Sequence, residues 1–584
     1  MTPPSAPWLG AVALGDGTVR FRLWAPAARR VELLLDGRAH TMAPEDDGCH
    51  CLTLRAAAGA RYRYRIDGGE PLPDPASRWQ PDGLHGDSAV VDPTAHAWQD
   101  PAWRGRPWHE AVVYELHVGS CGGYRGVAEQ LPRLAQWGIT AIELMPLAQF
   151  PGRRNWGYDG ALPFAPAAAY GHPDELRALV DRAHALGLMV LLDVVYNHFG
   201  PDGNHLGGYA PMFFRDDLPT PWGAAIDFRV PQVQRFFIDN ALMWLREYRF
   251  DGLRLDAVHA IRPPAFLGQL REAVYQALPP DRQVHLVLEN EDNRASLLGP
   301  GGYTAQWNDD FHNALHVMLT GETDGYYAAY AREPERLLAR VLGEGFAYQG
   351  QAMHDGRLRG EPSAQLPPTA FVAFLQNHDQ VGNRAFGERL RELVDEPRLR
   401  AATALLALCP MIPLFFQGEP WGSRAPFLFF TDFEPPLDAQ VREGRRREFA
   451  RFPAFADAHA RGAIPDPNAP ETFARSQVRI DEAGAGEGAR WAAWFAALLA
   501  LRHRHLVPLL PQARALGAGV PGPGAVEARW SLGALELQLA ANFGDAPVPL
   551  AAFPGARVLH AENGAGDGER LPPAGFVARL RDAP

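Results

Sequence analysis

The chain has 584 residues, and its 56 basic residues against 68 acidic ones give a formal net charge of −12. This acidic balance leaves no basic surface for phosphate backbones or anionic lipids, so we expect neither a nucleic-acid partner nor a membrane partner. Every basic residue is Arg and none is Lys. P-loop nucleotidases, pyridoxal-phosphate enzymes and protein kinases are therefore excluded, because each needs a lysine at its site.

The cysteines and the apolar stretches indicate the cellular compartment in which the protein is expected. Four cysteines, at positions 49, 51, 121 and 409, are too few and too scattered for a disulfide framework or a four-thiolate zinc site. The first residues lack the basic and apolar regions of a secretory signal. The longest apolar stretch, 402–416, contains two prolines and falls short of the ~20 residues that span a bilayer. We expect a soluble, cytoplasmic protein.

The first part of the chain alternates apolar and polar residues with period two. Val19, Phe21 and Leu23 form one such run, and 31–35 and 62–66 form two more, the last ahead of a turn at Asp67-Gly68. Short strands with one buried face predict an N-terminal β-sandwich domain over 1–93. A stretch rich in Pro and Trp, 71–107, is predicted to be its linker.

From position 111 strand-like apolar runs alternate with helical ones, which is typical of βαβ units. We expect eight strands, within 112–120, 139–147, 188–198, 251–258, 284–291, 304–311, 369–379 and 411–420. An open doubly wound sheet could use the same units, but eight strands that each end in polar residues favour a closed (β/α)8 TIM barrel of the α/β class. The predicted barrel domain is 94–507, with a short insertion near 198–230 and a last helix over 491–505. Alternation at Leu535, Leu537 and Leu539 predicts a small C-terminal β-domain over 508–584.

Candidate catalytic groups follow the predicted strands, as they do in barrel enzymes. Hydrolysis of a sugar acetal with retention needs one protonated and one ionised carboxyl group about 5–5.5 Å apart. Arg254 lies two residues before Asp256, so both side chains leave the strand on one face, and the guanidinium is expected to keep Asp256 anionic as a nucleophile. Glu289 closes an apolar run, where burial favours the protonated state of a general acid.

Other acidic residues compete for these roles. Glu291 and Asp292 are alternatives to Glu289, and Glu291 shares its strand face by period two. A polar cluster at 308–312 (Asn308, Asp309, Asp310 and His312) is either a cap between strand and helix or a substrate contact.

Four segments, DVVYNH (193–198), GLRLDAVHA (252–260), LVLENED (286–292) and FLQNHDQ (374–380), resemble the ordered signature segments of the α-amylase superfamily. The resemblance implies a glycoside hydrolase with Asp256 as nucleophile, Glu289 as acid/base and Asp379 as the carboxylate that holds and distorts the sugar. It further implies that Tyr158 is an aromatic platform beneath the sugar and that Asp193 organises the site. The substrate contacts that it implies are His198, Arg254 and His378.

A finer resemblance, over nearly the whole chain, is to the maltooligosyltrehalose trehalohydrolase family. It rests on segments such as YELHVGS, NHFGPDGN, QWNDDFHNALHVMLTGE, QNHDQVGNRAFGERL and PFLFFTDF. The Lys-His pair that follows the nucleophile in typical α-amylases is here His259-Ala260, which places His259 among the expected substrate contacts. The resemblance implies hydrolysis of the α-1,4 bond next to a terminal trehalose unit of maltooligosyltrehalose, with retention.

The interval from His198 to the helix near Pro231 is too short for the large calcium-binding insertion of many amylases, so we expect no metal and no cofactor. The resemblance implies a functional pairing with a maltooligosyltrehalose synthase. The sequence leaves the oligomeric state open, with a monomer favoured. Two alternatives stay open: a glycogen branching or debranching enzyme, and a non-catalytic glucan-binding or transporter-associated relative, although such relatives commonly lose one of the three carboxylates.

Overall fold

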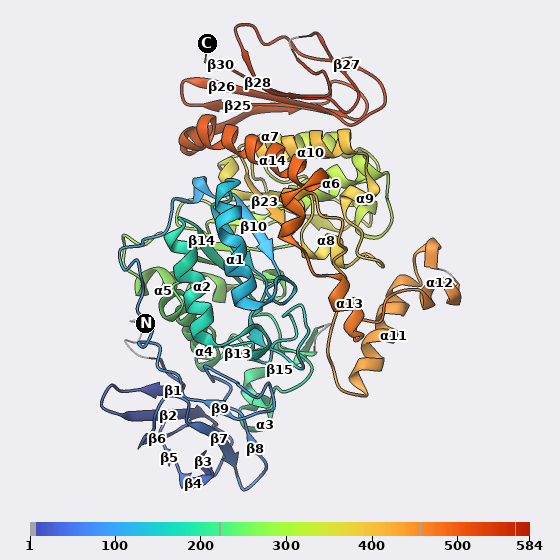
Figure 1. Cartoon of the computed structure of the whole chain (residues 1–584). Coiled ribbons are helices and arrows are strands. Elements are labelled where there is room, and N and C mark those ends of the chain that lie inside the picture. Colours follow the sequence, from blue (N-terminus) through green and yellow to red (C-terminus); the bar gives the residue numbers. More distant parts are fainter. Residues whose placement is uncertain (1–6, 221–222, 456, 567, 584) are drawn as a thin grey trace.

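The computed structural model describes residues 7–220, 223–455, 457–566 and 568–583. Three bodies follow one another along the molecule (Figure 1): an N-terminal pair of small sheets at one end, a barrel in the middle, and a C-terminal sheet at the other end. No helix in these ranges is both long enough and apolar enough to cross a lipid bilayer.

Eight parallel strands form the barrel, and it is closed because the last strand pairs with the first. The closure excludes the open doubly wound sheet and confirms the predicted TIM barrel. In barrel order the strands are β10 (Val113–Leu116), β11 (Ala141–Leu144), β14 (Met189–Val194), β17 (Gly252–Leu255), β18 (His285–Leu288), β19 (Ala305–Trp307), β22 (Phe371–Phe374) and β23 (Ile412–Phe416). Their carboxyl ends meet at one rim, where the functional side chains of such barrels gather.

Helices surround the barrel and cover its outer face (Figure 1). They bury apolar residues at helical spacing; α2, for example, buries Leu176, Leu179 and Val180 and begins with a capping box between His172 and Glu175. The covering helices are α1 (Gly123–Gln136), α2 (Pro173–Ala185), α4 (Pro231–Glu247), α5 (Ala265–Ala277), α6 (Asp309–Thr320), α7 (Pro334–Glu344), α10 (Glu396–Leu408) and α14 (Gly486–His505).

Further elements, most of them short, lie in the connections between these strands and helices. They are β12 (Ala148–Gln149), β13 (Leu162–Pro166), α3 (Leu206–Tyr209), β15 (Phe214–Thr220), β16 (Gly223–Ile226), β20 (Gln351–Ala352), β21 (Leu358–Arg359), α8 (His378–Gly382), α9 (Leu390–Leu393), α11 (Leu437–Phe449), α12 (Ala458–Gly462) and α13 (Pro470–Arg475).

The N-terminal body consists of two antiparallel sheets. One has the order β1 (Gly10–Ala13), β2 (Thr18–Trp24), β6 (Cys49–Arg55), β5 (Ala43–Pro44), and the other β4 (Arg38–Thr41), β3 (Val31–Leu35), β7 (Arg61–Ile66), β8 (Pro71–Leu72), with β9 (Ser88–Ala89) also paired to β7.

The linker predicted over 71–107 is wrong for its first part, because β8 and β9 both pair with β7. The segment between them is held by side chains: the Tyr62 hydroxyl donates to the buried Asp74 carboxylate over 2.8 Å. Strands of two residues are too short to show a period-two pattern. The prediction for this segment therefore rested on its Pro and Trp content alone.

The C-terminal body is a five-stranded antiparallel sheet packed on α7 and α10. Its order is β24 (Ala513–Gly519), β25 (Ala525–Leu532), β26 (Leu535–Asn542), β30 (Phe576–Asp582), β28 (Arg557–Glu562), and β27 (Val548–Pro549) pairs separately with β29 (Arg570–Leu571). The predicted alternation at Leu535–Leu539 falls on β26, the central strand of this sheet.

Candidate active site

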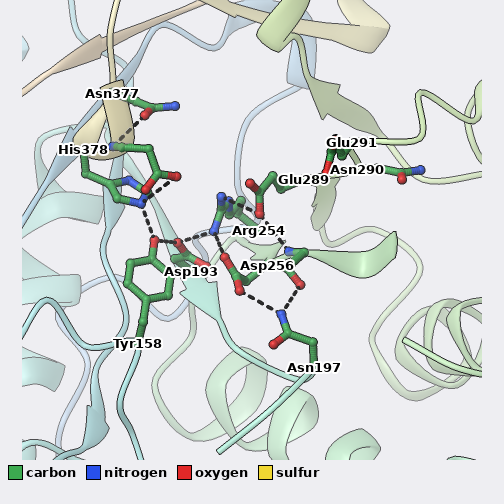
Figure 2. Close-up of polar contacts among 12 residues, drawn as sticks. Tyr158, Asp193, Asn197, Arg254, Asp256, Glu289, Asn290, Glu291, Asn377 and His378 are labelled. Atoms are coloured by element: carbon green, nitrogen blue, oxygen red, sulfur yellow. Dashed lines mark hydrogen bonds and ion pairs between the residues drawn. The ribbon is translucent and has the colours of Figure 1, made fainter. Parts of the chain in front are cut away.

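A single guanidinium lies at the centre of the carboxyl rim of the barrel (Figure 2). Arg254, on β17, is fully buried, and its Nη1 contacts Asp193 at 2.6 Å and Asp256 at 2.9 Å. Its Nη2 lies 3.0 Å from Glu289, and its Cζ lies 4.2 Å from the centroid of the Trp307 ring. Three carboxyl groups from three strands therefore share one positive charge, and the cation needs them because an unpaired buried charge is costly.

Asp256 follows β17 directly, and its amide continues the barrel ladder by donating to the Val194 carbonyl over 3.1 Å. Asn197, beyond the end of β14, donates to the Asp256 carboxylate over 2.8 Å. Burial raises the pKa of Asp256, and the Arg254 charge opposes this shift without outweighing it. The Arg254 charge thus favours the ionised state of Asp256, as expected from the sequence, but it is divided among three carboxyl groups.

Glu289 follows β18 and is held by the backbone of the neighbouring strand. The Ala257 amide, next to Asp256 in sequence, donates to Glu289 Oε2 over 2.7 Å. Ala257 has φ of 41°, in the left-handed region that residues other than glycine rarely adopt. Burial raises the pKa of Glu289, with the Arg254 charge opposing and the Asp256 charge adding to the rise. This rise favours the protonated state that a proton donor needs.

Glu291 points away from this cluster (Figure 2). Its side chain is 52 % exposed and lies 2.9 Å from Arg357 on the loop before β21. Burial acts to raise the pKa of Glu291, but the hydrogen bond from Arg357 and the charge of His259 outweigh it and lower the pKa. An exposed, ionised carboxylate is a poor general acid, and Asp292 is exposed as well.

His378 and Tyr158 form the second side of the cluster. The Tyr158 hydroxyl lies 2.6 Å from Asp193 and 2.8 Å from His378 Nε2, and the two rings stack with centroids 5.1 Å apart. His378 Nδ1 lies 2.5 Å from Glu115 on β10. Burial lowers the pKa of His378, but the Asp379 and Glu115 carboxylates outweigh it and raise the pKa to about 9. His378 is therefore positively charged at neutral pH.

Asp379 lies in the first turn of the short helix α8, which Asn377 caps. Its side chain is 39 % exposed, lies 3.4 Å from His378 Nε2, and accepts a hydrogen bond from Asn383 over 3.1 Å. Of the three candidate catalytic carboxyl groups it is the most open to solvent. It is therefore placed to accept hydrogen bonds from a sugar.

The two remaining histidines occupy different surroundings. His198 Nε2 lies 3.0 Å from the Tyr158 carbonyl, Nδ1 contacts Asn197, and burial lowers the pKa of His198 to about 4, so it is neutral. His259 lies on the short turn Val258–Ala260 after the nucleophile segment, partly exposed, and its Nδ1 accepts from the Glu291 amide over 3.3 Å. His259 thus stands on the Glu291 side of the cluster.

The polar cluster at 308–312 is mostly structural. Asp310 is fully buried and accepts from Asn293 over 2.9 Å and from the Ala347 amide over 2.7 Å, with Arg359 at 3.3 Å. Asn308 and His312 are also buried, and each contacts a backbone carbonyl. Asp309 differs, because burial, followed by the Glu289 charge, raises the pKa of Asp309 to about 7. This carboxyl group therefore interacts electrostatically with Glu289.

Three residues of the site were not among the sequence candidates: Glu115, Asn197 and Trp307. Asn197 lies within the same DVVYNH segment as Asp193 and His198, and Glu115 lies in the first predicted strand run. Either could have been found by asking which polar side chains share the inward face of a strand or follow its end. Trp307 gave no such signal, because an apolar ring at a strand end is ordinary packing.

Within the described part of the chain, one group of side chains has metal-ligand spacing: Glu45, Asp47 and Cys49, in the N-terminal body. Arg22 pairs with both of its carboxylates, at 2.6 and 2.8 Å. A guanidinium already occupies the place of a cation there, so we assign no function to it.

Comparison with known proteins agrees with this architecture. Residues 88–206 match the family model described as the alpha amylase catalytic domain, 8–95 match carbohydrate-binding module 48 (isoamylase N-terminal domain), and 513–577 match a domain of unknown function. A solved structure of a putative alpha amylase from Salmonella typhimurium is 43 % identical, with a TM-score of 0.94, covering 99 % of this chain and all of that one. A pullulanase from Anoxybacillus at 18 % identity and TM-score 0.72 shares the fold.

Curated relatives are more specific. The malto-oligosyltrehalose trehalohydrolase of Deinococcus radiodurans is 44 % identical over 507 residues, covering 85 % of this chain and 82 % of the relative. That of a Rhizobium species is 40 % identical over 605 aligned positions, covering 97 % and 98 %. A glycogen branching enzyme from Photobacterium profundum matches only 41 % of this chain. With this level of identity over most of both chains, the protein belongs to the malto-oligosyltrehalose trehalohydrolase family of α-amylase-type glycoside hydrolases.

Proposed function

We propose that this enzyme hydrolyses the α-1,4-glucosidic bond next to the terminal trehalose of maltooligosyltrehalose, releasing trehalose and a maltooligosaccharide with retention of configuration. The observation that carries the proposal is the Arg254 cluster: one buried and two partly buried carboxyl groups on one guanidinium, with burial raising the pKa of Glu289. One proton shared in such a set leaves a protonated acid beside an ionised carboxylate, which is what acetal hydrolysis requires.

In the first step Glu289 gives its proton to the glycosidic oxygen as the bond to the anomeric carbon breaks. The Asp256 carboxylate attacks that carbon and forms a covalent glycosyl ester, while trehalose leaves. Arg254 and Asn197 hold Asp256, so the attacking oxygen is oriented before the substrate arrives. Arg254 is fully buried, and its contacts are to carboxyl groups. It thus acts as a positioning residue rather than by touching the sugar.

In the second step Glu289, now ionised, takes a proton from water, and the oxygen of that water attacks the same carbon from the side that trehalose has left. The ester bond between that carbon and Asp256 breaks at the same time, which frees the Asp256 carboxylate, releases the maltooligosaccharide and leaves Glu289 protonated again. Two inversions give retention. Asp379 and the charged His378 bind hydroxyl groups of the sugar at the cleavage site, and the Tyr158 ring lies beneath it. Asp193 anchors Tyr158 and Arg254 from below, at 2.6 Å from each.

The trehalose specificity rests on the leaving-group side. An α,α-1,1-linked glucose pair has no reducing end and is more sharply bent than maltose, and here the position of the usual lysine is His259, held by the Glu291 amide. The relatives named for this activity support the assignment. Since a 1,1 linkage at the chain end must be made before it can be released, we propose a functional pairing with a maltooligosyltrehalose synthase.

The test compares maltotriosyltrehalose with maltopentaose, which contains the same number of glucose units. We expect kcat/KM for the trehalose-capped substrate to be at least about tenfold higher, roughly 1.4 kcal/mol of transition-state discrimination. Equal values, or products with new α-1,6 branches, would favour a branching or debranching enzyme. New reducing ends should appear first as the α-anomer in NMR spectra, and a chelator should leave the rate unchanged. An early β-anomer would refute retention, and loss of activity that calcium restores would refute a metal-free site.

A further inference from the structure

A cavity with both polar and apolar walls lies next to the segment that follows β22 and carries His378 and Asp379. It encloses about 370 Å³ not filled by protein atoms, part of it open to solvent, and a water-sized sphere fits in only a small part of it. Its walls come from the segments after β22 and β23 and from the helices α10 and α14, which lie together in Figure 1. The polar and aromatic lining includes Gln376, Arg389, Arg391, Thr403, Glu419 and Trp491.

Arg389 brings an unbalanced charge to this cavity. The residue is 1 % exposed, and its guanidinium donates to two backbone carbonyls, those of Gln417 at 2.7 Å and Ala425 at 2.5 Å. Its Nη2 is buried and has no acceptor among the described residues, and no described carboxylate forms an ion pair with it. A buried guanidinium normally has an anionic partner, because leaving one unpaired is costly.

Arg391 adds two more donors. Its side chain is 6 % exposed and packs over the Trp491 ring, with Cζ 4.5 Å from the ring centroid. Nη2 pairs with Glu487, but Nε and Nη1 are buried and have no acceptor within the described ranges. Gly422 has φ of 64°, and a Cβ there would lie 2.7 Å from Arg391 Nη1. The glycine therefore keeps the approach to this nitrogen open.

The acidic residue in the lining does not balance these donors. Glu419 accepts from the Phe416 amide over 2.5 Å. Burial raises the pKa of Glu419 to about 8, against the lowering effects of that amide and of the Arg389 charge, so the group is mostly protonated at neutral pH. Three buried guanidinium nitrogens of the lining residues Arg389 and Arg391 therefore have no acceptor among the described residues, where Glu419 forms no ion pair with either arginine.

We propose that this cavity binds a small inorganic anion of halide size, held by Arg389 Nη2 and Arg391 Nη1. The anion would receive hydrogen bonds from these two nitrogens, one from each arginine, and neutralise the unpaired charge of Arg389. Gln376, in the lining, lies two residues before His378 and accepts from the Leu390 amide over 3.0 Å. Gln376 therefore links the segment that carries the candidate catalytic residues to the one that carries both arginines.

The first experiment uses the whole unmodified protein, exchanged into sodium gluconate. Chloride is titrated in at constant ionic strength while the unfolding midpoint is measured, and bromide is titrated in the same way. We expect a saturable rise of about 2 °C with either halide, because a ligand that binds only the folded state stabilises it. A midpoint that does not change, or that changes linearly without saturation, would overturn the proposal.

A matched pair of variants assigns the effect to the cavity. Arg391→Gln should abolish the saturable rise, whereas Arg424→Gln should keep it, because Arg424 contacts the same Glu487 at 3.5 Å but is 54 % exposed and absent from the lining. If both variants lose the rise, or both keep it, the halide binds elsewhere.

Should Arg391→Gln fail to fold, crystals of the unmodified protein grown with bromide still decide the matter. An anomalous difference peak within hydrogen-bonding distance of the Arg389 and Arg391 nitrogens supports the site. A cavity that contains only water in these crystals refutes it.

Discussion

Two acidic clusters lie close to the carboxyl ends of the barrel strands, one around Arg254 and one around Asp310, and their carboxyl groups differ in how many partners they have. Around Arg254, three carboxyl groups share one guanidinium, and Asp193 Oδ1 has no hydrogen-bond partner among the described residues. Around Asp310, one carboxylate receives an arginine, an asparagine amide, a backbone amide and a tyrosine hydroxyl. The first cluster has more acid than its partners can satisfy, and the second has all the partners it needs.

The difference separates chemical carboxylates from structural ones. A satisfied buried carboxylate stabilises the fold and has nothing left to offer a substrate. A crowded one is poised to bind a proton or a substrate, and the fold pays for that crowding. Replacement of an acid should therefore cost activity in the Arg254 cluster and stability in the Asp310 cluster.

The largest effect is expected for Asp256→Asn. The amide keeps the shape of the side chain but cannot attack the anomeric carbon, so kcat should fall on the order of 10⁵-fold. Because the substitution also relieves crowding around Arg254, the free energy of unfolding should stay equal or rise. Steady-state kinetics and urea denaturation measure the two quantities, and an Asp256→Asn protein that retains substantial activity would remove the nucleophile assignment.

The next effect separates Glu289 from Glu291. Glu289→Gln should lower kcat by roughly 10²–10⁴-fold, least for substrates with a good leaving group, because general-acid assistance is lost. Glu291→Gln is the matched control two residues away, with an exposed side chain, and should keep most of the activity. If the control is the inactive variant, the acid has been assigned to the wrong residue.

The satisfied cluster should show the reverse behaviour. Asp310→Asn leaves the Arg359 side chain, which is 8 % exposed, without its buried ionic partner. We expect a loss of about 3–5 kcal/mol in the free energy of unfolding, measured by urea denaturation. A stability loss for Asp256→Asn as large as that for Asp310→Asn would break the distinction between the clusters.

The smallest effect concerns the ion pair between His378 and Glu115. The pKa of His378 is about 9 in the folded protein, above its ordinary value of 6.5, so the pair stabilises the fold fully below pH 6.5. This contribution is lost as the pH rises through 9. Glu115→Gln should therefore lower the free energy of unfolding by about 1–3 kcal/mol at pH 6 and by less at pH 10.

The control for this pH dependence is Glu110→Gln. Glu110 pairs with the guanidinium of Arg106, so no histidine takes part in this ion pair and the control should have the same small effect at both pH values. A Glu115→Gln effect that is independent of pH would mean that His378 does not carry the charge.

Much of the barrel and of the candidate site could be predicted because both are local in sequence. A strand is a short apolar run, and Asp193, Asp256 and Glu289 each lie at the end of one. Partners within the cluster are distant in sequence: Glu115 and His378, which contact each other, are 263 residues apart. Periodicity carries no information on such pairs, which is why the sharing of Arg254 among three acids, and its effect on Asp256, came only from the structure.

The prediction of a linker over 71–107 was wrong in its first part for a related reason. The order of this segment comes from single side chains, such as the Asp74 carboxylate that receives the Tyr62 hydroxyl, and from strands of two residues. Composition rich in Pro and Trp is common to linkers and to rigid packed loops. Distinguishing them requires the identity of the partner, which only the fold supplies.

The backbone between Asp256 and Glu289 has a consequence for how such an enzyme can change. The Ala257 amide holds the Glu289 carboxylate, and Glu289 in turn donates its amide to Leu255 and accepts at its carbonyl from Val258. Main-chain bonds between adjacent strands thus hold the two segments that carry these carboxyl groups in register. Loops around the rim can be replaced without altering that register. Engineering or evolution can therefore alter which leaving group is accepted while the stereochemical outcome stays the same.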